Sequence, residues 1–163
     1  MGYKLALSGV LVVSVIAGIG GLTGDRDLVN AEAEASSARA STANGRLATV
    51  ARRAMNRFRA RHRRHRLRYS PSLSRSARRQ AIYMARHGFG HRSTVHASRA
   101  FRSVSEIILK HRGAHGDPGT AISGWGRSPA HRSIMLNGRY GSLGVAVVTR
   151  GGVTYWVAHV GRP

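Results

Sequence analysis

Two apolar segments at the C-terminal end of the chain constrain the fold most strongly. Segments 143–149 and 153–160 are rich in β-branched and aromatic residues, and Gly151-Gly152 lies between them. Adjacent glycines adopt the positive φ angles of a tight hairpin turn without steric cost. The pattern therefore predicts a hairpin of two antiparallel strands that ends the fold.

Two helices are expected before this hairpin. Apolar residues recur at helical spacing over 46–61 and over 73–85, and each set forms one stripe. A turn at Tyr69-Ser70-Pro71 separates the two helices. The first helix also carries several arginines that we expect on its other faces, namely Arg52, Arg53, Arg57 and Arg59. Helices followed by an antiparallel hairpin indicate an α+β domain.

The segment 125–132 combines several structural signals. It reads Trp-Gly-Arg-Ser-Pro-Ala-His-Arg, which predicts that the Ser128 side chain caps a helix starting at Pro129. His131 then lies in the first turn, at a depth set by Trp125. A partly exposed histidine at the start of a helix needs no function, so His131 is a candidate that requires partners.

Carboxylates are scarce in this chain. It has 27 Lys and Arg against six Asp and Glu, and past residue 35 the only acids are Glu106 and Asp117. Asp117 precedes a proline and is expected to cap a helix. Glu106 lies within the apolar segment 104–109, which fits a strand or the start of a helix, and a buried carboxylate needs a partner. An arginine partner would indicate a structural role, whereas a histidine or a metal would indicate a functional one.

Several chemistries are excluded by the residues themselves. The chain has no cysteine, and therefore no disulfide and no thiolate nucleophile. It also lacks the sequence signatures of the serine-hydrolase elbow, the zinc-protease helix and the phosphate-binding loop. A single free acid argues against a two-carboxylate glycosidase.

Three side chains are left as candidate catalytic residues: His91, Glu106 and His131. Two imidazoles and a carboxylate suit an open zinc site with three protein ligands and a water. They suit a metal-free acid/base pair equally well. Sequence spacing does not prove that the three converge.

The N-terminal segment is typical of an export signal. An apolar run over 5–19 follows Lys4, and small residues suited to cleavage occur around 29–33. We therefore expect a signal peptide over 1–31, a flexible leader over 32–45 and one domain over 46–163. The alternative is an uncleaved membrane anchor. In both cases the domain lies outside the cytoplasm, secreted or anchored.

The net charge of +21 predicts salt-dependent binding of polyanions. Anionic lipid and anionic cell-envelope polymers are the expected classes, with membrane contact through the basic surface or the N-terminal segment. The densest cluster, 61–66, has no interleaved aromatic residues on which bases would stack. Nucleic acid is therefore a disfavoured partner.

Short motifs spread over residues 47–161 resemble the bacterial branch of the CAP superfamily. This superfamily, which shares the SCP domain, includes cysteine-rich secretory proteins, antigen 5 and plant pathogenesis-related proteins of group one. The most specific piece is Trp125-x-x-Ser128-Pro129-x-His131-Arg132 with the hairpin that follows. Weaker pieces occur in the same order as in the family: Asn56-x-x-Arg59, Leu73 to Met84, Phe89-Gly90-His91, Tyr140-x-x-Leu143-Gly144-Val145 and Tyr155-Trp156.

The resemblance implies a three-layer α-β-α sandwich with an antiparallel sheet and a central cavity lined by His91, Glu106 and His131. In members of the family the two histidines can bind zinc. The family's Gly-Glu-Asn reads Ser105-Glu106-Ile107 here, and Ser128 replaces a second cavity acid.

Because one acid makes a hydrolytic site less complete, we expect an exported binding protein rather than an enzyme. A metal-assisted hydrolase with Glu106 as base or ligand is an alternative, as is a cationic protein that binds envelope polymers or lipid. The family has no single agreed activity: members are associated with lipid or sterol binding, proteolysis and defence.

Overall fold

The computed structural model describes residues 24–92, 100–113 and 116–163, which leaves most of the expected export signal outside the described residues. The chain divides into two compact units, 1–36 and 37–163. The second unit contains the sheet and the candidate site. No helix in the described ranges is both long and apolar enough to cross a lipid bilayer.

The first helix is longer than predicted. α1 (Gly24–Arg61) includes 32–45, where the sequence predicts a flexible leader. Alanine recurs every two or three residues through this stretch. Alanine has the highest helix propensity of any residue, so a helix is favoured here without any apolar periodicity. The buried residues of its apolar stripe begin at Ala51, followed by Met55 and Phe58, while Leu47 and Ala48 pack against the same core partly buried.

A four-stranded sheet forms the centre of the second unit. Its strands are β1 (Arg68–Tyr69), β2 (Ser103–Arg112), β3 (Ser142–Arg150) and β4 (Val153–Arg162), in the order β1-β3-β4-β2. The predicted hairpin is confirmed: Gly151 and Gly152 have φ angles of 56° and 70°. Segment 104–109 belongs to a strand, since β2 pairs with β4 along its length.

The sheet is mixed rather than wholly antiparallel, because β1 pairs parallel with β3. The chain between β1 and β3 passes through three helices and β2. A connection of this length allows parallel pairing, which a tight hairpin cannot provide.

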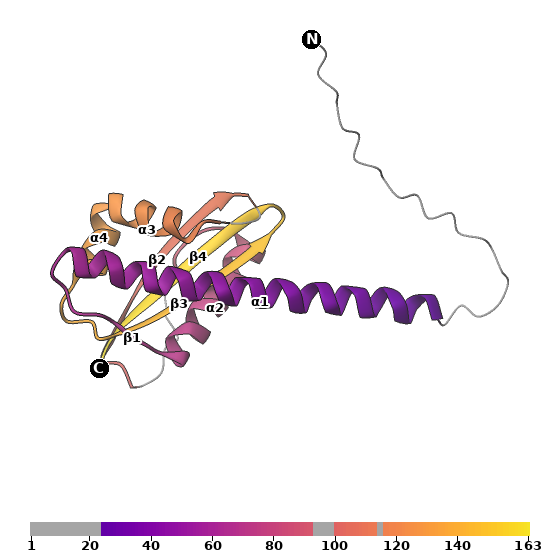
Figure 1. The fold of residues 1–163 in the computed structure, drawn as a ribbon, viewed down its shortest axis with the longest axis horizontal. Helices are drawn as coiled ribbons and strands as arrows, with labels where there is room; N and C mark the ends of the chain where they lie inside the picture. Colours follow the sequence, from indigo (N-terminus) through magenta and orange to yellow (C-terminus); the bar gives the residue numbers. More distant parts are fainter. Residues whose placement is uncertain (1–23, 93–99, 114–115) are drawn as a thin grey trace, which may run out of the picture. The chain divides into compact units, whose positions relative to one another are not determined.

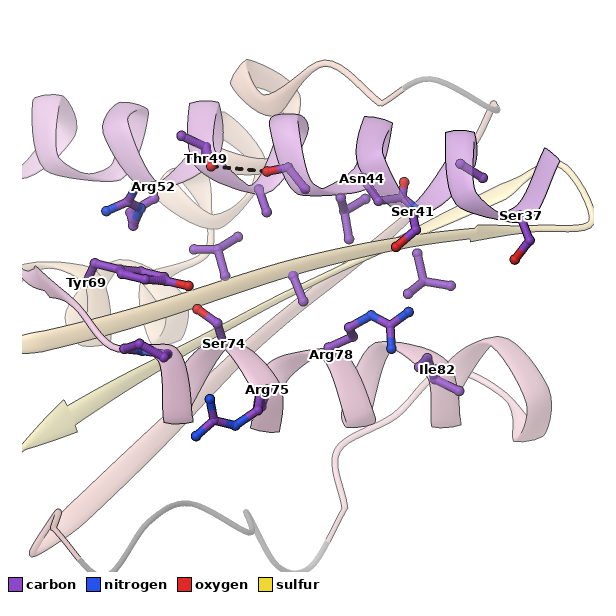
Figure 2. A pocket seen from close by; sticks show the side chains of 18 residues that line it. Ser37, Ser41, Asn44, Thr49, Arg52, Tyr69, Ser74, Arg75, Arg78 and Ile82 are labelled. Atoms are coloured by element: carbon purple, nitrogen blue, oxygen red, sulfur yellow. Dashed lines mark hydrogen bonds between the residues drawn. The ribbon is translucent and has the colours of Figure 1, made fainter. Parts of the chain in front are cut away.

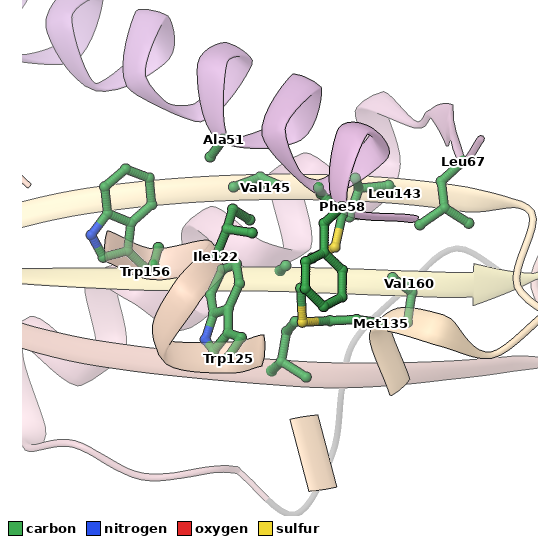
Figure 3. Packing of buried hydrophobic residues seen from close by; sticks show 14 of the residues in the cluster. Ala51, Phe58, Leu67, Ile122, Trp125, Met135, Leu143, Val145, Trp156 and Val160 are labelled. Atoms are coloured by element: carbon green, nitrogen blue, oxygen red, sulfur yellow. The ribbon is translucent and has the colours of Figure 1, made fainter. Parts of the chain in front are cut away.

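Helices cover both faces of the sheet, as the expected three-layer sandwich requires (Figure 1). On one face α1 packs with α3 (Pro118–Arg127) and α4 (Pro129–Leu136) around Trp125 and Trp156 (Figure 3). On the other face α2 (Pro71–His87) packs against a second cluster that includes Val157. Trp156 and Val157 face opposite layers because strand side chains alternate.

Arg59 departs from the prediction that it lies on an outer face of the first helix, because it is completely buried. Its Nε donates to the carbonyl of His65 at 2.9 Å, and its Nη1 donates to the carbonyls of Met135 and Asn137. The last carbonyls of a helix have no donors within that helix. Arg59 supplies them at the end of α4, and burial, followed by the charge of Arg64, lowers its pKa.

Ser128 begins α4 as predicted, but its hydroxyl makes no capping hydrogen bond. Its N–H donates to the Trp125 carbonyl at 3.2 Å, so the same residue also ends α3. Its backbone, rather than its side chain, therefore joins the two helices. The predicted cap at Asp117 is confirmed, since its carboxylate accepts from the N–H groups of Gly119 and Thr120.

Candidate functional site

Glu106 on β2 is held between two histidines. Its Oε1 accepts a hydrogen bond from His91 Nδ1 and its Oε2 accepts one from His159 Nε2, each at 2.8 Å. The Glu106 side chain is only 5 % exposed, whereas that of His91 is 53 % exposed. The partners of this carboxylate are therefore imidazoles, and no described arginine forms an ion pair with it.

His159 was not among the residues selected from the sequence. It lies on β4 directly opposite Glu106, and its side chain is 1 % exposed. A histidine between Ala158 and Val160 is unusual in a strand that is otherwise almost wholly apolar. That irregularity was a usable signal, because a buried polar side chain needs a partner and Glu106 was the only unassigned acid.

The end of α2 positions His91. The buried Gln80 side chain donates from Nε2 to the Gly90 carbonyl at 2.8 Å, which anchors the backbone immediately before His91. The helix has already ended at Gly88, where φ is 109°. His91 is thereby placed beside β2, although 15 residues separate it from Glu106.

His131, in the first turn of α4, lies next to His91. The two ring centroids are 6.4 Å apart and the ring planes are inclined by 55°. Burial lowers the pKa of His131, and the nearby His91 lowers it further. The structure therefore brings together all three residues selected from the sequence, with His91 in contact with both of the others.

The pKa of Glu106 reflects opposing effects. Burial raises it, but the hydrogen bonds and charges of His159 and His91 outweigh burial, so its pKa is below the ordinary value. The carboxylate therefore stays ionised near neutral pH, with one oxygen bound to each histidine.

The donor chemistry can be compared with what zinc requires. A zinc-binding histidine usually donates its second ring N–H to a carboxylate, and His91 makes such a bond to Glu106. Its Nε2 and the imidazole of His131 are then the available donors. The described residues contain no group of three or more potential ligands around one point. They fit a site with two histidine ligands whose other positions are taken by water.

Comparison with known families gives a clear match. The model of the cysteine-rich secretory protein family, CAP, matches residues 52–160. The chain belongs to the CAP family. The four residues of the histidine–glutamate cluster, His91, Glu106, His131 and His159, all lie within the matched part of this CAP domain.

Solved structures share the fold at low sequence identity. An outer surface protein from Borrelia burgdorferi has a TM-score of 0.61 and 15 % identity, covering 70 % of this chain and 90 % of that one. An extracellular protein containing an SCP domain from Bacillus anthracis has a TM-score of 0.64 and 21 % identity, covering 88 % of this chain and 45 % of that one. A venom allergen-like protein from Schistosoma mansoni has a TM-score of 0.56 and 10 % identity, covering 74 % and 88 %. No curated protein matches this chain by sequence.

Proposed function

We propose that this CAP domain is an exported binding protein whose histidine–glutamate cluster holds a ligand without converting it. The observation that supports this best is that both oxygens of Glu106 already accept hydrogen bonds. A general base needs an oxygen within reach of the proton it removes. A carboxylate with a lowered pKa is also a weaker base.

The absence of a second free acid supports the same proposal. Asp117 is the only other acid past residue 35, and it caps α3. A hydrolase with metal-bound water would have to use Glu106, either as a base or as a ligand. It would have to act through the second lone pair of an oxygen that already accepts a hydrogen bond from His91 or from the buried His159.

Export is proposed from two observations. The apolar run over 5–19 has the length and position of a secretion signal. Similar folds occur in an outer surface protein of B. burgdorferi and an extracellular protein of B. anthracis. A membrane-anchored form of the same chain is the alternative, and comparing the N-terminal residue of secreted and cell-bound protein distinguishes the two.

His91 and His131 would be the zinc ligands in this proposal. A bound zinc would supply a Lewis-acidic point at which an anionic or carbonyl group of the ligand is held. Glu106 would orient the His91 ring through Nδ1, and His159 would hold Glu106 in place from the buried side. The lowered pKa of His131 leaves its imidazole neutral and able to coordinate at neutral pH.

Zinc titration calorimetry tests this assignment. We expect saturable heat with the unmodified chain and its loss in H91A/H131A. H87A is the matched control, because His87 is exposed at the end of α2 and contacts Tyr83 instead. Equal heats in H91A/H131A and the unmodified chain would rule out the proposed metal ligands.

The hydrolase alternative is tested separately with a panel of peptide and ester substrates. The binding proposal predicts no turnover with or without added zinc. Turnover that is abolished by E106Q would overturn it and would identify Glu106 as part of a catalytic site.

A second candidate function is binding of anionic envelope polymers or lipid by the basic surface. It is favoured by the cluster 61–66, in which all four arginines are exposed, while both acids of the domain are engaged elsewhere. Binding to heparin and to anionic vesicles should fall steeply with salt. It should also weaken when Arg61, Arg63, Arg64 and Arg66 are replaced by serine. Salt-independent binding would contradict this function.

A further inference from the structure

β3 has an edge that no strand covers over part of its length. β1 pairs only with Ser142 and Leu143, through hydrogen bonds from β1 and Ser70 to the carbonyls of Gly141 and Leu143. Main-chain groups of alternate residues point to the same side of a strand. The N–H and C=O groups of Val145 and Val147 therefore point to this edge, and no described strand pairs with them there.

The uncovered edge lies in a groove of about 660 Å³ between α1 and α2. Figure 2 shows the two helices on either side of β3, with side chains from both pointing towards the space between them. Residues 145–148 line the groove from the sheet. Val145 and Val147 are themselves only 6 % and 3 % exposed, so an added strand would have to enter the groove between the two helices. The α1 side of the groove consists mainly of small side chains, which narrow it least: Ser37, Ala40, Ser41, Gly45 and Ala48.

Arginines line both sides of this edge groove. Arg52 projects from α1, where its guanidinium lies 4.5 Å from the centre of the Tyr69 ring. Arg75 and Arg78 project from α2. Three positive charges around an uncovered strand edge would attract an extended segment that carries negative charge.

The domain has no carboxylate left to neutralise these arginines. Glu106 is bound by His91 and His159, and Asp117 caps α3. The undescribed segments 1–23, 93–99 and 114–115 contain no Asp or Glu at all. The remaining acids, Asp25, Asp27, Glu32 and Glu34, belong to the other unit, 1–36. Within residues 37–163 no free Asp or Glu matches these arginines, so an acidic partner fits the charge of the groove.

We propose that the edge groove binds an extended acidic polypeptide segment of another protein, which adds to the sheet as a strand beside β3. Its main chain would exchange hydrogen bonds with Val145 and Val147, as in other cases of strand addition. Successive side chains of the added strand would point in turn towards α1 and α2. Acidic side chains on one face would meet Arg52, and those on the other would meet Arg75 and Arg78.

The exposed edge sets the length of the segment. Four β3 residues, 145–148, line the groove. At about 3.3 Å per residue they offer an edge of roughly 13 Å, enough for four or five residues of an added strand. A second copy of this chain is a poorer occupant, because pairing two β3 edges would bring two sets of arginines together.

The probe is a ten-residue peptide of repeating Glu-Glu-Val-Val with blocked ends, which places acid on both faces of a strand. We expect it to bind roughly tenfold or more tightly than a copy N-methylated at alternate residues, which keeps the side chains but loses main-chain hydrogen bonds. Amide exchange at Val145 and Val147 should slow on binding. A Lys-Lys-Val-Val peptide should not bind.

Two variants test the geometry. Arg75 and Arg78 are exposed on α2, so R75S/R78S should fold normally and lose most of the affinity. R53S/R57S removes the same amount of charge from exposed positions outside the groove, and this variant should keep its affinity for the peptide. V147P removes one edge N–H and should also weaken binding, since proline is tolerated at a strand edge.

Three outcomes would overturn the proposal. Equal affinity for the N-methylated peptide would mean that charge alone attracts the probe. Equal losses in R75S/R78S and R53S/R57S would place the binding elsewhere on the surface. A concentration-dependent dimer that protects Val145 and Val147 without peptide would assign the edge to a second copy of the chain.

Discussion

His159 Nε2 lies 2.8 Å from Glu106 Oε2, and both side chains are almost completely buried. This contact joins β4 to the edge strand β2 with a charged acceptor inside the domain. Because the bond is buried, its loss would leave an ionised group with one partner fewer.

We therefore expect H159A to lower the free energy of unfolding by about 1–3 kcal/mol. Urea denaturation at neutral pH measures it. H87A, at an exposed histidine, should change the value by less than about 0.5 kcal/mol. A stable H159A would mean that the Glu106–His91 bond alone satisfies the carboxylate.

Stability should fall in acid because of Glu106. Its folded pKa is below the ordinary value of about 4.3, so the unfolded state binds the proton more readily as the pH falls. The stabilisation from Glu106 is complete above the unfolded pKa and is lost as the pH falls through the folded pKa. Denaturation between about pH 5 and 3, with a chelator present, measures the slope. E106Q should flatten it, and an unchanged slope would contradict the assignment.

Replacing the buried Arg59, which lies outside the candidate site, should lower the free energy of unfolding substantially. R59M keeps much of the apolar volume but removes the donors to His65, Met135 and Asn137, so we expect a loss of about 2–4 kcal/mol. R59K should recover only part of this, since an ammonium lacks the planar fork of a guanidinium. Thermal and urea unfolding check it, with R57M at an exposed position as the control. Equal effects at positions 57 and 59 would contradict the burial of Arg59.

Gly144 and Gly45 make a matched pair for substitution by alanine. A Cβ at Gly144 would lie 2.2 Å from the main chain of Leu73 and Ser74, whereas one at Gly45 meets nothing within 4 Å. We expect G144A to destabilise by about 1–3 kcal/mol or more through overpacking. G45A should stabilise by up to about 1 kcal/mol, because it replaces glycine within a helix. If G144A and G45A changed the urea midpoint by similar amounts, α2 would have to be able to move away from β3.

The sequence predicted those elements whose signals are local. The hairpin followed from Gly151-Gly152, and the cap at Asp117 followed from one residue and its proline. The N-terminal part of α1 was missed because its helical tendency comes from alanine content rather than from an apolar period. The Ser128 hydroxyl was assigned a cap because one residue was not expected to end one helix and begin the next.

The site was only partly accessible from sequence. His91, Glu106 and His131 could be selected by elimination, but the pairing of Glu106 with His159 depends on the β2–β4 register, which the sequence does not specify. Arg59 follows Met55 by four positions and therefore lies on the same helix face. That spacing was visible, but the free carbonyls at the end of α4 that make burial favourable were not.

The double role of Ser128 has a mechanical consequence. Because a single residue separates α3 from α4, no linker can absorb a shift of one helix relative to the other. Trp125 is embedded in the apolar interior, so any loosening there is transmitted directly to the ring of His131. The packing of a tryptophan four residues before Pro129 is thus expected to influence how far His131 lies from His91.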